Sequence, residues 1–251
     1  MKKWTLLLLL SVFLFSLSGN AFALPVIDGV FGLIEWAGYY AEEDNASGTL
    51  NTQVGPGWGG QYYDVEYLGL IVTPTTVFFG LQTGFDVVNG RDWGDNDHFD
   101  PGDFALDINS DGTYDYAIKF SINSPPVFQL YTGGEWQSVR YDGDPPPNYA
   151  KYSDPFVMDG GGLVGDPFTG ALGVVDNQGD TSYVLEGSFD LSLLSGYQWG
   201  DPITIHWTME CGNDYLNQTS APVPEPATMF LFGIGLCGLA IVGRKRIVKG
   251  R

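Results

Sequence analysis

Apolar side chains that alternate along the chain with a period of two residues are its most constraining feature. The stretch Tyr63–Phe85 carries apolar, aromatic or small residues at alternate positions on both sides of a turn at Thr73–Thr75. The stretch Phe104–Phe120 repeats this around a second tight turn, with apolar residues at even-numbered positions on both arms. This period is typical of strands with one buried face. No middle segment sustains the helical period of about 3.6 residues, so helices should be few and short.

Further strands are expected in the rest of the middle region. A third hairpin is predicted in Val127–Tyr141, with its turn at Gly133–Gly134, and single strands in 182–194 and 202–211. The stretch Asp142–Asp180 is rich in Gly and Pro, which predicts a long surface loop over one sheet. Many short strands joined by Gly, Pro and Asp turns predict an all-β fold, an antiparallel β-sandwich of the jelly-roll-like type.

The N-terminus has the pattern of a secretory signal peptide. Lys2 and Lys3 precede an apolar run over residues 4–17, and Ala21 and Ala23 then form a small-x-small cleavage site. The apolar run is short for a membrane span of ~20 residues, which disfavours an uncleaved anchor. We therefore expect residues 1–23 to be removed during export.

A single transmembrane helix is expected near the C-terminus. The triplet Pro224, Glu225 and Pro226 precedes the uncharged stretch Ala227–Gly243, which at ~1.5 Å per residue would extend about 25 Å. A basic stop signal follows it, which the positive-inside rule keeps in the cytoplasm and which consists of Arg244, Lys245 and Arg246. The chain therefore divides into a signal peptide (1–23), an ectodomain (24–220) and a tail (221–251).

The ectodomain is strongly acidic. All 30 acidic residues lie between residues 24 and 226, whereas only four cations do, so this stretch has a net charge of −26. Such a surface repels nucleic acids and anionic membranes, which are therefore poor partners, and attracts divalent cations. Cys211 in the ectodomain and Cys237 in the apolar tail should not pair, so the fold must be held by its core.

The strongest chemical pattern in the ectodomain is an Asp-rich turn. Asp107, Asn109 and Asp111, followed by a glycine, fit the opening of a calcium loop, and Asp115 falls at its ninth position. Ile118 stands where an EF-hand needs a bidentate Glu, which excludes a helical EF-hand. A structural Ca²⁺ on the hairpin turn is one interpretation. A metal-free turn is the other, because Asn and Asp side chains bond their own backbone.

Two tryptophans lie among glycines and aspartates, where an indole is hard to bury. Trp58 and Trp93 are candidates for stacking against a sugar ring, although loop indoles also fold back onto their own sheet. Trp36, Trp136 and Trp207 lie in strand-like settings and are expected in the core.

Signals for catalysis are weak. The sequence has no G-x-S-x-G, no H-E-x-x-H and no phosphate loop, and its two histidines are His98 and His206. A non-enzymatic protein is therefore predicted. The alternative is a secreted glycan-active hydrolase that uses paired carboxylates, which 30 acidic residues could supply.

The tail resembles the PEP-CTERM sorting signal of Gram-negative bacteria, which combines a Pro-Glu-Pro triplet, an apolar span and a basic end. The resemblance implies recognition of Pro224, Glu225 and Pro226 by an exosortase, a polytopic membrane protease with a cysteine nucleophile, in cells that make extracellular polysaccharide and biofilm matrix. The span would then hold a precursor in the inner membrane until processing near the triplet.

The ectodomain is similar to the β-sandwich of family 9 carbohydrate-binding modules and the related DOMON domains. The similarity lies in VIDGVFGLIEWAGYY, GDFALDINSDGTYDYAIKF, SYVLEGSFDLSLL and TIHWTMECGNDYLN. It implies a ligand-binding sandwich with structural calcium. Together these features predict an exported cell-surface or extracellular-matrix protein, non-enzymatic and associated with exopolysaccharide. A purely structural coat protein is a further alternative.

Overall fold

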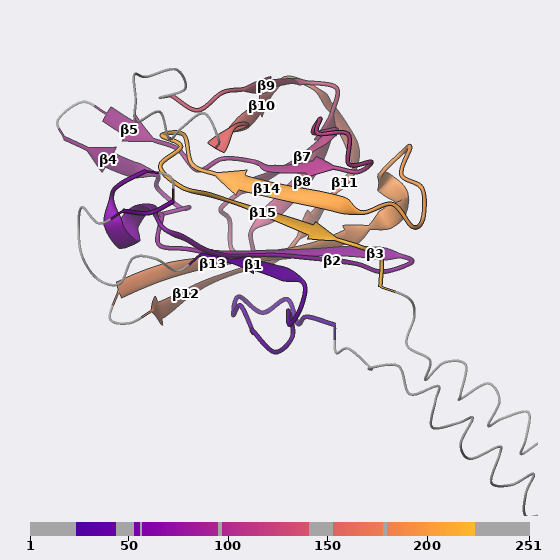
Figure 1. Cartoon of the computed structure of the whole chain (residues 1–251), viewed down its shortest axis with the longest axis horizontal. Helices are drawn as coiled ribbons and strands as arrows, with labels where there is room; N and C mark the ends of the chain where they lie inside the picture. The colour runs from indigo at the N-terminus through magenta and orange to yellow at the C-terminus, as the bar shows by residue number, and fades with distance from the viewer. Residues whose placement is uncertain are drawn as a thin grey trace, which may run out of the picture. The chain divides into compact units, whose positions relative to one another are not determined.

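The protein is an antiparallel β-sandwich (Figure 1), seen in a computed structural model that describes residues 24–43, 53–55, 57–94, 97–140, 153–177 and 180–223. Residues Pro25–Val223 form one compact unit. Within each of the two main sheets, every pair of neighbouring strands is antiparallel. This confirms the predicted all-β class. Over the described ranges, no helix is long and apolar enough to cross a membrane. The predicted span 227–243 lies outside those ranges.

One layer of the sandwich is a five-stranded sheet, at the bottom of the domain in Figure 1. Its strand order is β1-β2-β3-β13-β12. The strands are β1 (Tyr40–Glu42), β2 (Val65–Val72), β3 (Thr76–Thr83), β13 (Asp180–Asp190) and β12 (Ala171–Asn177).

The other layer is a six-stranded sheet of order β11-β8-β7-β6-β14-β15. Its strands are β11 (Gly162–Thr169), β8 (Val127–Thr132), β7 (Tyr116–Ser121), β6 (Phe104–Asp107), β14 (Ile203–Thr208) and β15 (Tyr215–Ser220). Two short ribbons and two 3₁₀ turns complete the domain: β4 (Arg91–Trp93) with β5 (Asp97–Phe99), β9 (Glu135–Gln137) with β10 (Val157–Asp159), η1 (Gly60–Tyr63) and η3 (Leu191–Leu193).

The main core lies between the two sheets and is rich in aromatic rings. Phe79 of β3 meets Phe104 of β6 and Phe128 of β8 edge to face, with ring centroids 5.1 Å apart in each pair. Such contacts add about 0.5–1.5 kcal/mol per pair to the gain from burial alone. Trp207 of β14 is fully buried in the same cluster and donates from Nε1 to the Gly102 carbonyl at 3.0 Å.

Two of the predicted hairpins are confirmed. β2 and β3 pair across the turn at Thr73–Thr75, and β6 pairs with β7 across the Asp-rich turn. In β2, however, the residues that point into the core change from odd-numbered to even-numbered positions, because a bulge shifts the register between Val65 and Tyr67. Beyond the bulge the even-numbered residues enter the core between the sheets, while Tyr67 and Ile71 point to the outer side of the sheet.

The third predicted hairpin is wrong. β8 pairs with β7 and β11, whereas β9 leaves the sheet and pairs with β10. The turn at Gly133–Gly134 exists, with Gly133 at a φ of 72°, but it redirects the chain instead of folding it back on itself. Turn residues predict a change in chain direction, but they do not predict which strand the following strand will pair with.

The predicted loop over Asp142–Asp180 is also wrong over residues 157–177, which form β10, β11 and β12. β11 and β12 are the edge strands of the two sheets, where Gly and Pro are tolerated. A register shift in β11 between Val164 and Phe168 spans Pro167, which has no N–H to give to the ladder.

A second, smaller core covers the outer face of the five-stranded sheet. The N-terminal segment, residues 25–39, places Phe31 and Trp36 against Ile71 and Val184, and it is the indigo loop below the sheet in Figure 1. Trp36 is fully buried, and a side chain at Gly69 would collide with its ring. Both faces of this sheet are therefore covered, which explains why its strands are apolar at successive positions.

Candidate ligand-binding end of the sandwich

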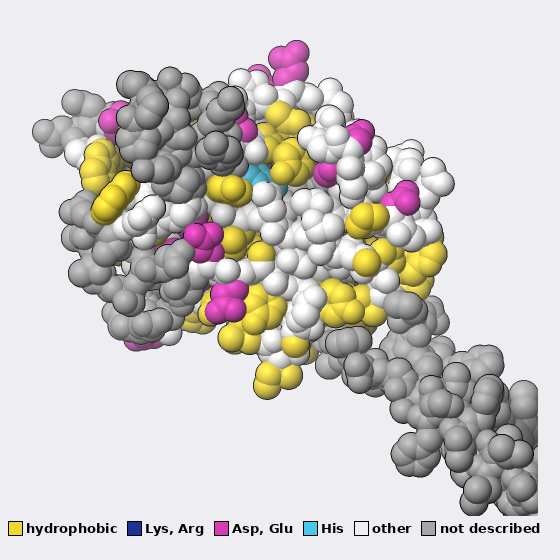
Figure 2. Space-filling view, in the orientation of Figure 1, with side chains coloured by type: hydrophobic (Ala, Val, Ile, Leu, Met, Phe, Trp, Pro, Cys, Tyr) yellow, Lys and Arg dark blue, Asp and Glu magenta, His cyan; other side chains and the backbone are white. Residues whose placement is uncertain are grey.

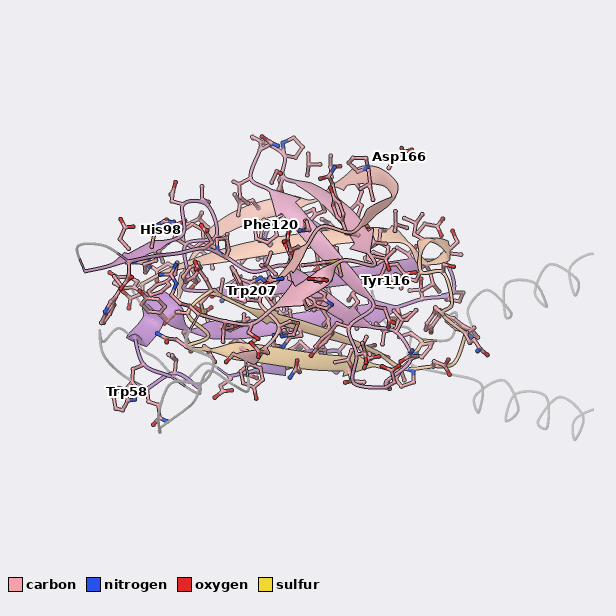
Figure 3. All side chains as sticks on the ribbon, turned by 90° about the horizontal axis from the view of Figure 1, so that it is seen from above. Trp58, His98, Tyr116, Phe120, Asp166 and Trp207 are labelled. Carbon is pink, nitrogen blue, oxygen red and sulfur yellow. The ribbon has the colours of Figure 1, made fainter. Side chains whose placement is uncertain are left out.

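The two tryptophans predicted to stack on a ligand are exposed. Trp58 precedes η1 and Trp93 ends β4, and their side chains are 56% and 52% accessible to solvent. Trp58 lies at the end of the molecule where His98 of β5 is also found, at the left in Figure 3. Their role as ligand platforms stays a prediction, because accessibility alone does not identify a ligand.

Tyr63 lies between Trp93 and the backbone that follows Trp58. Its ring makes an edge-to-face contact with Trp93, with centroids 6.1 Å apart. The same ring lies so close to the backbone of Gly59 that a Cβ at that position would be 2.2 Å from it. Gly59 follows Trp58 directly, and the Trp58 carbonyl accepts a hydrogen bond of 2.5 Å from Asn213 Nδ2. The buried Tyr63 ring therefore contacts the Trp93 indole and the backbone beside Trp58.

Charged side chains surround Trp93 on the β4–β5 ribbon. His98 Nδ1 lies 2.7 Å from Asp92 Oδ1, and His98 Nε2 lies 3.4 Å from Asp100 Oδ1. The hydrogen bond to Asp92 raises the pKa of His98 above its usual value. On the same ribbon, the Arg91 guanidinium lies over the Tyr62 ring, 3.9 Å from its centroid.

Arg140 joins this ribbon to the β14–β15 connection. Its guanidinium makes a 2.5 Å ion pair with Glu210 and a 3.5 Å contact with Asp97, and it lies 5.0 Å from the centroid of the Phe99 ring. The end of the sandwich therefore combines two accessible indoles with carboxylates, a histidine and two arginines. Aromatic faces with hydrogen-bonding groups beside them suit a neutral polyhydroxylated ligand.

The remaining tryptophans have different environments. Trp36 and Trp207 are fully buried, as predicted. Trp136 is only partly buried and donates from Nε1 to the Tyr114 carbonyl at 2.8 Å. Trp199, which sequence reasoning did not single out, is 51% accessible in the connection between η3 and β14.

The predicted calcium turn is organised by hydrogen bonds to its own backbone. Asp107 Oδ1 accepts from the N–H groups of Asn109 (3.1 Å) and Ser110 (2.7 Å), and Asp107 Oδ2 accepts from that of Gly112 (3.0 Å). Asp115 Oδ2 accepts from Ile108 N at 3.0 Å.

The other two predicted ligands of the turn are used in the same way. Asn109 Oδ1 accepts from Asp111 N, and Asp111 Oδ1 accepts from Thr113 N, at 3.0 and 2.8 Å. Among the residues that the structure describes, no three His, Cys, Asp or Glu side chains are grouped to hold a metal ion. This geometry matches the metal-free alternative, and the bound calcium stays a prediction.

Sequence reasoning missed two buried carboxylates on the outer face of the five-stranded sheet. Glu66 of β2 accepts from Gln82 Nε2 and Ser182 Oγ, each at 2.5 Å, and from Gln61. Glu186 of β13 is also fully buried, and burial raises its pKa to about 6. Acidic residues are mostly exposed in proteins. The strand sequences could therefore not predict that these two side chains are buried unless the sheet was known to be covered on both faces.

Two further polar groups are structural. His206 is buried, with Nδ1 2.8 Å from Asn217 Oδ1 and Nε2 3.0 Å from the Ser153 carbonyl. Cys211 is fully buried, as expected for a small apolar side chain, and burial raises the pKa of its thiol to about 12. Neither group is accessible to a ligand.

Comparison with known families decides the interpretation of the tail. Residues 222–246 match the family described as the PEP-CTERM protein-sorting motif. The chain carries a PEP-CTERM sorting motif. This motif marks an exported protein that is anchored at the membrane as a precursor and processed by an exosortase. No curated protein and no solved structure matches the chain.

The residues predicted to act in targeting lie outside the described part of the chain. They are the cleavage residues Ala21 and Ala23, the triplet Pro224, Glu225 and Pro226, and the stop residues Arg244, Lys245 and Arg246. The match to the sorting motif covers the triplet, the apolar span and the stop residues.

Proposed function

We propose that the processed protein is a non-enzymatic component of the cell surface or extracellular matrix that binds extracellular polysaccharide through Trp58 and Trp93. The observation that carries the proposal is the pair of accessible indoles, of which Trp93 packs on the buried Tyr63 ring and Trp58 directly precedes Gly59, whose backbone lies against the same ring. The sorting motif supports the proposal because it marks an exported protein that an exosortase processes at the membrane.

Stacking on a sugar ring uses the parts that this end of the sandwich offers. An indole presents a large flat apolar face to the C–H groups of a pyranose ring, and neighbouring polar groups bond its hydroxyls. Asp92 of β4 and Asp100, which directly follows β5, are exposed carboxylates of the ribbon that carries Trp93, and Asp97 is the cross-strand partner of Trp93. The strongly acidic surface of the domain favours a neutral glycan over an anionic one.

Glu66 and Glu186 are poor candidates for the carboxylate pair of a glycosidase. Glu66 and Glu186 are 0% accessible and accept hydrogen bonds from the chain itself. A glycosidase needs two carboxyl groups that reach a substrate, separated by about 5–9 Å. Glu66 and Glu186 cannot reach a substrate in this way, because both side chains are buried and hydrogen-bonded to the chain.

The test is binding to the neutral polysaccharide fraction of the producing cells, measured by affinity electrophoresis. Trp58→Ala and Trp93→Ala should each weaken binding severalfold, while Trp199→Ala, with an equally accessible indole at a different place, should leave it unchanged. Equal effects of all three variants would contradict the proposal. Release of reducing ends would favour the hydrolase alternative, and assembly that depends on divalent cations without glycan binding would favour a structural coat protein.

A further inference from the structure

Four apolar side chains of the N-terminal segment point into solvent. Ile34 is 91% accessible, and three further residues are about half accessible: Val26, Val30 and Leu33. Figure 2 shows apolar side chains along the lower edge of the domain, where Figure 1 places this segment. We call these four residues the N-terminal apolar patch. Grouped apolar side chains on a protein surface usually mark an interface.

The patch is displayed on a firmly held turn. The Gly32 carbonyl accepts hydrogen bonds from Glu35 N (2.8 Å) and Trp36 N (3.1 Å), so Leu33 and Ile34 occupy the tip. Trp36 anchors the turn from beneath, because its ring is fully buried and its Nε1 donates to Glu186 at 3.3 Å. The two most prominent apolar groups are therefore presented outward by a buried support.

The C-terminal end of the domain reaches the same face of the sheet. Val223 N donates to the Val72 carbonyl at 2.7 Å, and the Val223 side chain packs against the cluster that contains Phe31 and Trp36. The apolar span of the tail begins at Ala227, four residues later. Even a fully extended chain covers only about 14 Å over that distance. The covalent chain therefore tethers Val223, at the edge of this face, within about 14 Å of the start of the apolar span.

The N-terminal end of the domain also lies on this face of the five-stranded sheet. Asp28 N and Gly29 N donate to Glu186 at 3.2 and 2.9 Å, which fixes the start of the domain on this face. The predicted cleavage after Ala23 lies only a few residues earlier. Residues close to both ends of the described domain, Asp28 and Val223, thus lie on the same side of one sheet.

We propose that the N-terminal apolar patch inserts into the lipid interface of the membrane that holds the tail. The proposal rests on the membrane-anchored precursor of the proposed function. Neutral lipid is the partner that fits, because the acidic domain repels anionic headgroups. The two acidic side chains of the N-terminal segment form hydrogen bonds within that segment. Asp28 Oδ1 accepts from Val30 N at 3.0 Å, and Glu35 Oε2 accepts from Val26 N at 3.3 Å.

Lipid contact would serve the processing step. Insertion of Leu33 and Ile34 holds the domain against the bilayer and so keeps the neighbouring Pro-Glu-Pro triplet at the membrane surface, where a membrane protease acts. A patch of four side chains binds a bilayer only weakly by itself. Once the tail is removed, the domain therefore leaves the membrane without any further change.

The experiment uses the full chain, reconstituted through its tail into phosphatidylcholine vesicles that contain spin-labelled lipid. A fluorophore is attached through Ile34→Cys in a Cys237→Ser background, because Cys211 is buried. The matched control carries the fluorophore through Leu163→Cys, a half-accessible position on β11 of the other sheet. Quenching at position 34 should exceed quenching at 163 severalfold, and equal quenching would overturn the inference.

Two further arms separate the ways in which the experiment could fail. Vesicle flotation reports anchorage: a chain that does not float contradicts the anchored precursor itself, whereas a floating chain with equal quenching overturns only the patch. Val30→Asp with Leu33→Asp should reduce quenching at position 34 to the control level without changing flotation. Protection of position 34 only when exosortase is present would assign the patch to the protease and overturn lipid contact.

Discussion

The indole of Trp36 donates from Nε1 to Oε1 of Glu186 at 3.3 Å, and both side chains are fully buried between the N-terminal segment and the five-stranded sheet. The other carboxylate oxygen of Glu186 accepts from Asp28 N and Gly29 N. The Glu186 carboxyl group on β13 therefore holds the N-terminal segment by hydrogen bonds, although the residues it bonds are 150 to 158 positions earlier in the sequence. The covered face of the sheet depends on this contact.

Glu186 should make the stability of the domain fall as the pH rises. Burial raises its pKa from 4.5 to about 6, with the charge of Asp28 as a smaller cause, while the three hydrogen bonds oppose the shift. Because the folded protein holds the proton more tightly than the unfolded chain, this contribution is complete below pH 4.5 and is lost as the pH rises through about 6. A shift of this size corresponds to about 2 kcal/mol.

Replacement of Glu186 tests this linkage. Across the window from pH 4.5 to 6, the free energy of urea unfolding of Glu186→Gln should increase with pH relative to that of the unmodified chain, because the contribution that falls with rising pH has been removed. Glu42→Gln, which removes an exposed carboxyl group on β1 at the far edge of the same sheet, should leave the profile unchanged. Identical profiles for all three proteins would show that Glu186 does not titrate in this window.

Gly69→Ala should displace Trp36. A Cβ at Gly69 would lie 2.4 Å from Trp36 Cε3, which is too close for a carbon contact, so the indole or the strand must move. Overpacking of this kind costs about 1–3 kcal/mol. Gly162→Ala is the matched control, because the nearest atom to a Cβ there is 4.0 Å away. The expected result is a lower melting temperature and red-shifted tryptophan emission for Gly69→Ala alone.

The sequence predicted the parts of the fold that depend on local alternation. The β2–β3 and β6–β7 hairpins are marked by turn residues between two alternating arms, so each carries its pairing in a short stretch. The pairing of β9 with β10 and the edge positions of β11 and β12 are set by distant partners. Periodicity and turn composition carry no information about such partners, which is why these elements were predicted wrongly.

The candidate site was predictable only in part. Glycines and aspartates around Trp58 and Trp93 predicted that both indoles would be accessible. The contact of Trp93 with Tyr63 could not be predicted, because it depends on how η1 and β4 approach each other in space. The buried Glu66 and Glu186 were missed for a related reason: burial of an outward-facing residue depends on a covering segment that the strand sequence does not reveal.

Asp107→Ala should destabilise the domain whether or not calcium is present. The carboxylate accepts three backbone N–H groups of its own turn, and these groups lose their partner when the side chain is truncated. A loss of about 1–3 kcal/mol is expected. Asp166→Ala, an exposed aspartate in the β11 bulge, should have little effect. Equal stability of the two variants would contradict this role of Asp107.

Calcium removal is the direct test of the predicted ion. If Ca²⁺ binds the turn, EDTA lowers the melting temperature of the unmodified protein, and Asp111→Asn weakens the response to added calcium. Asp111 is the informative position because its carboxylate lies in the turn and supports only one backbone bond, to Thr113 N. Superimposable melting curves with EDTA and with saturating calcium would leave the metal-free turn as the explanation.

His206 should oppose Glu186 in the acid range. Burial lowers the pKa of His206 from 6.5 to about 4, although the contacts with Asn217 and Ser153 favour the charged form. The unfolded chain therefore binds the proton first, and stability that is complete above pH 6.5 is lost as the pH falls through about 4. The full loss amounts to about 3 kcal/mol.

The two linkages have opposite slopes between pH 4.5 and 6 and partly cancel in the unmodified protein. We therefore predict that Glu186→Gln steepens the loss of stability on acidification, and that adding His206→Gln to that variant removes most of the slope. His98→Gln in the same background should preserve the slope, because His98 lies on the exposed β4–β5 ribbon. A slope that survives His206→Gln would assign the acid sensitivity to the buried carboxylates instead.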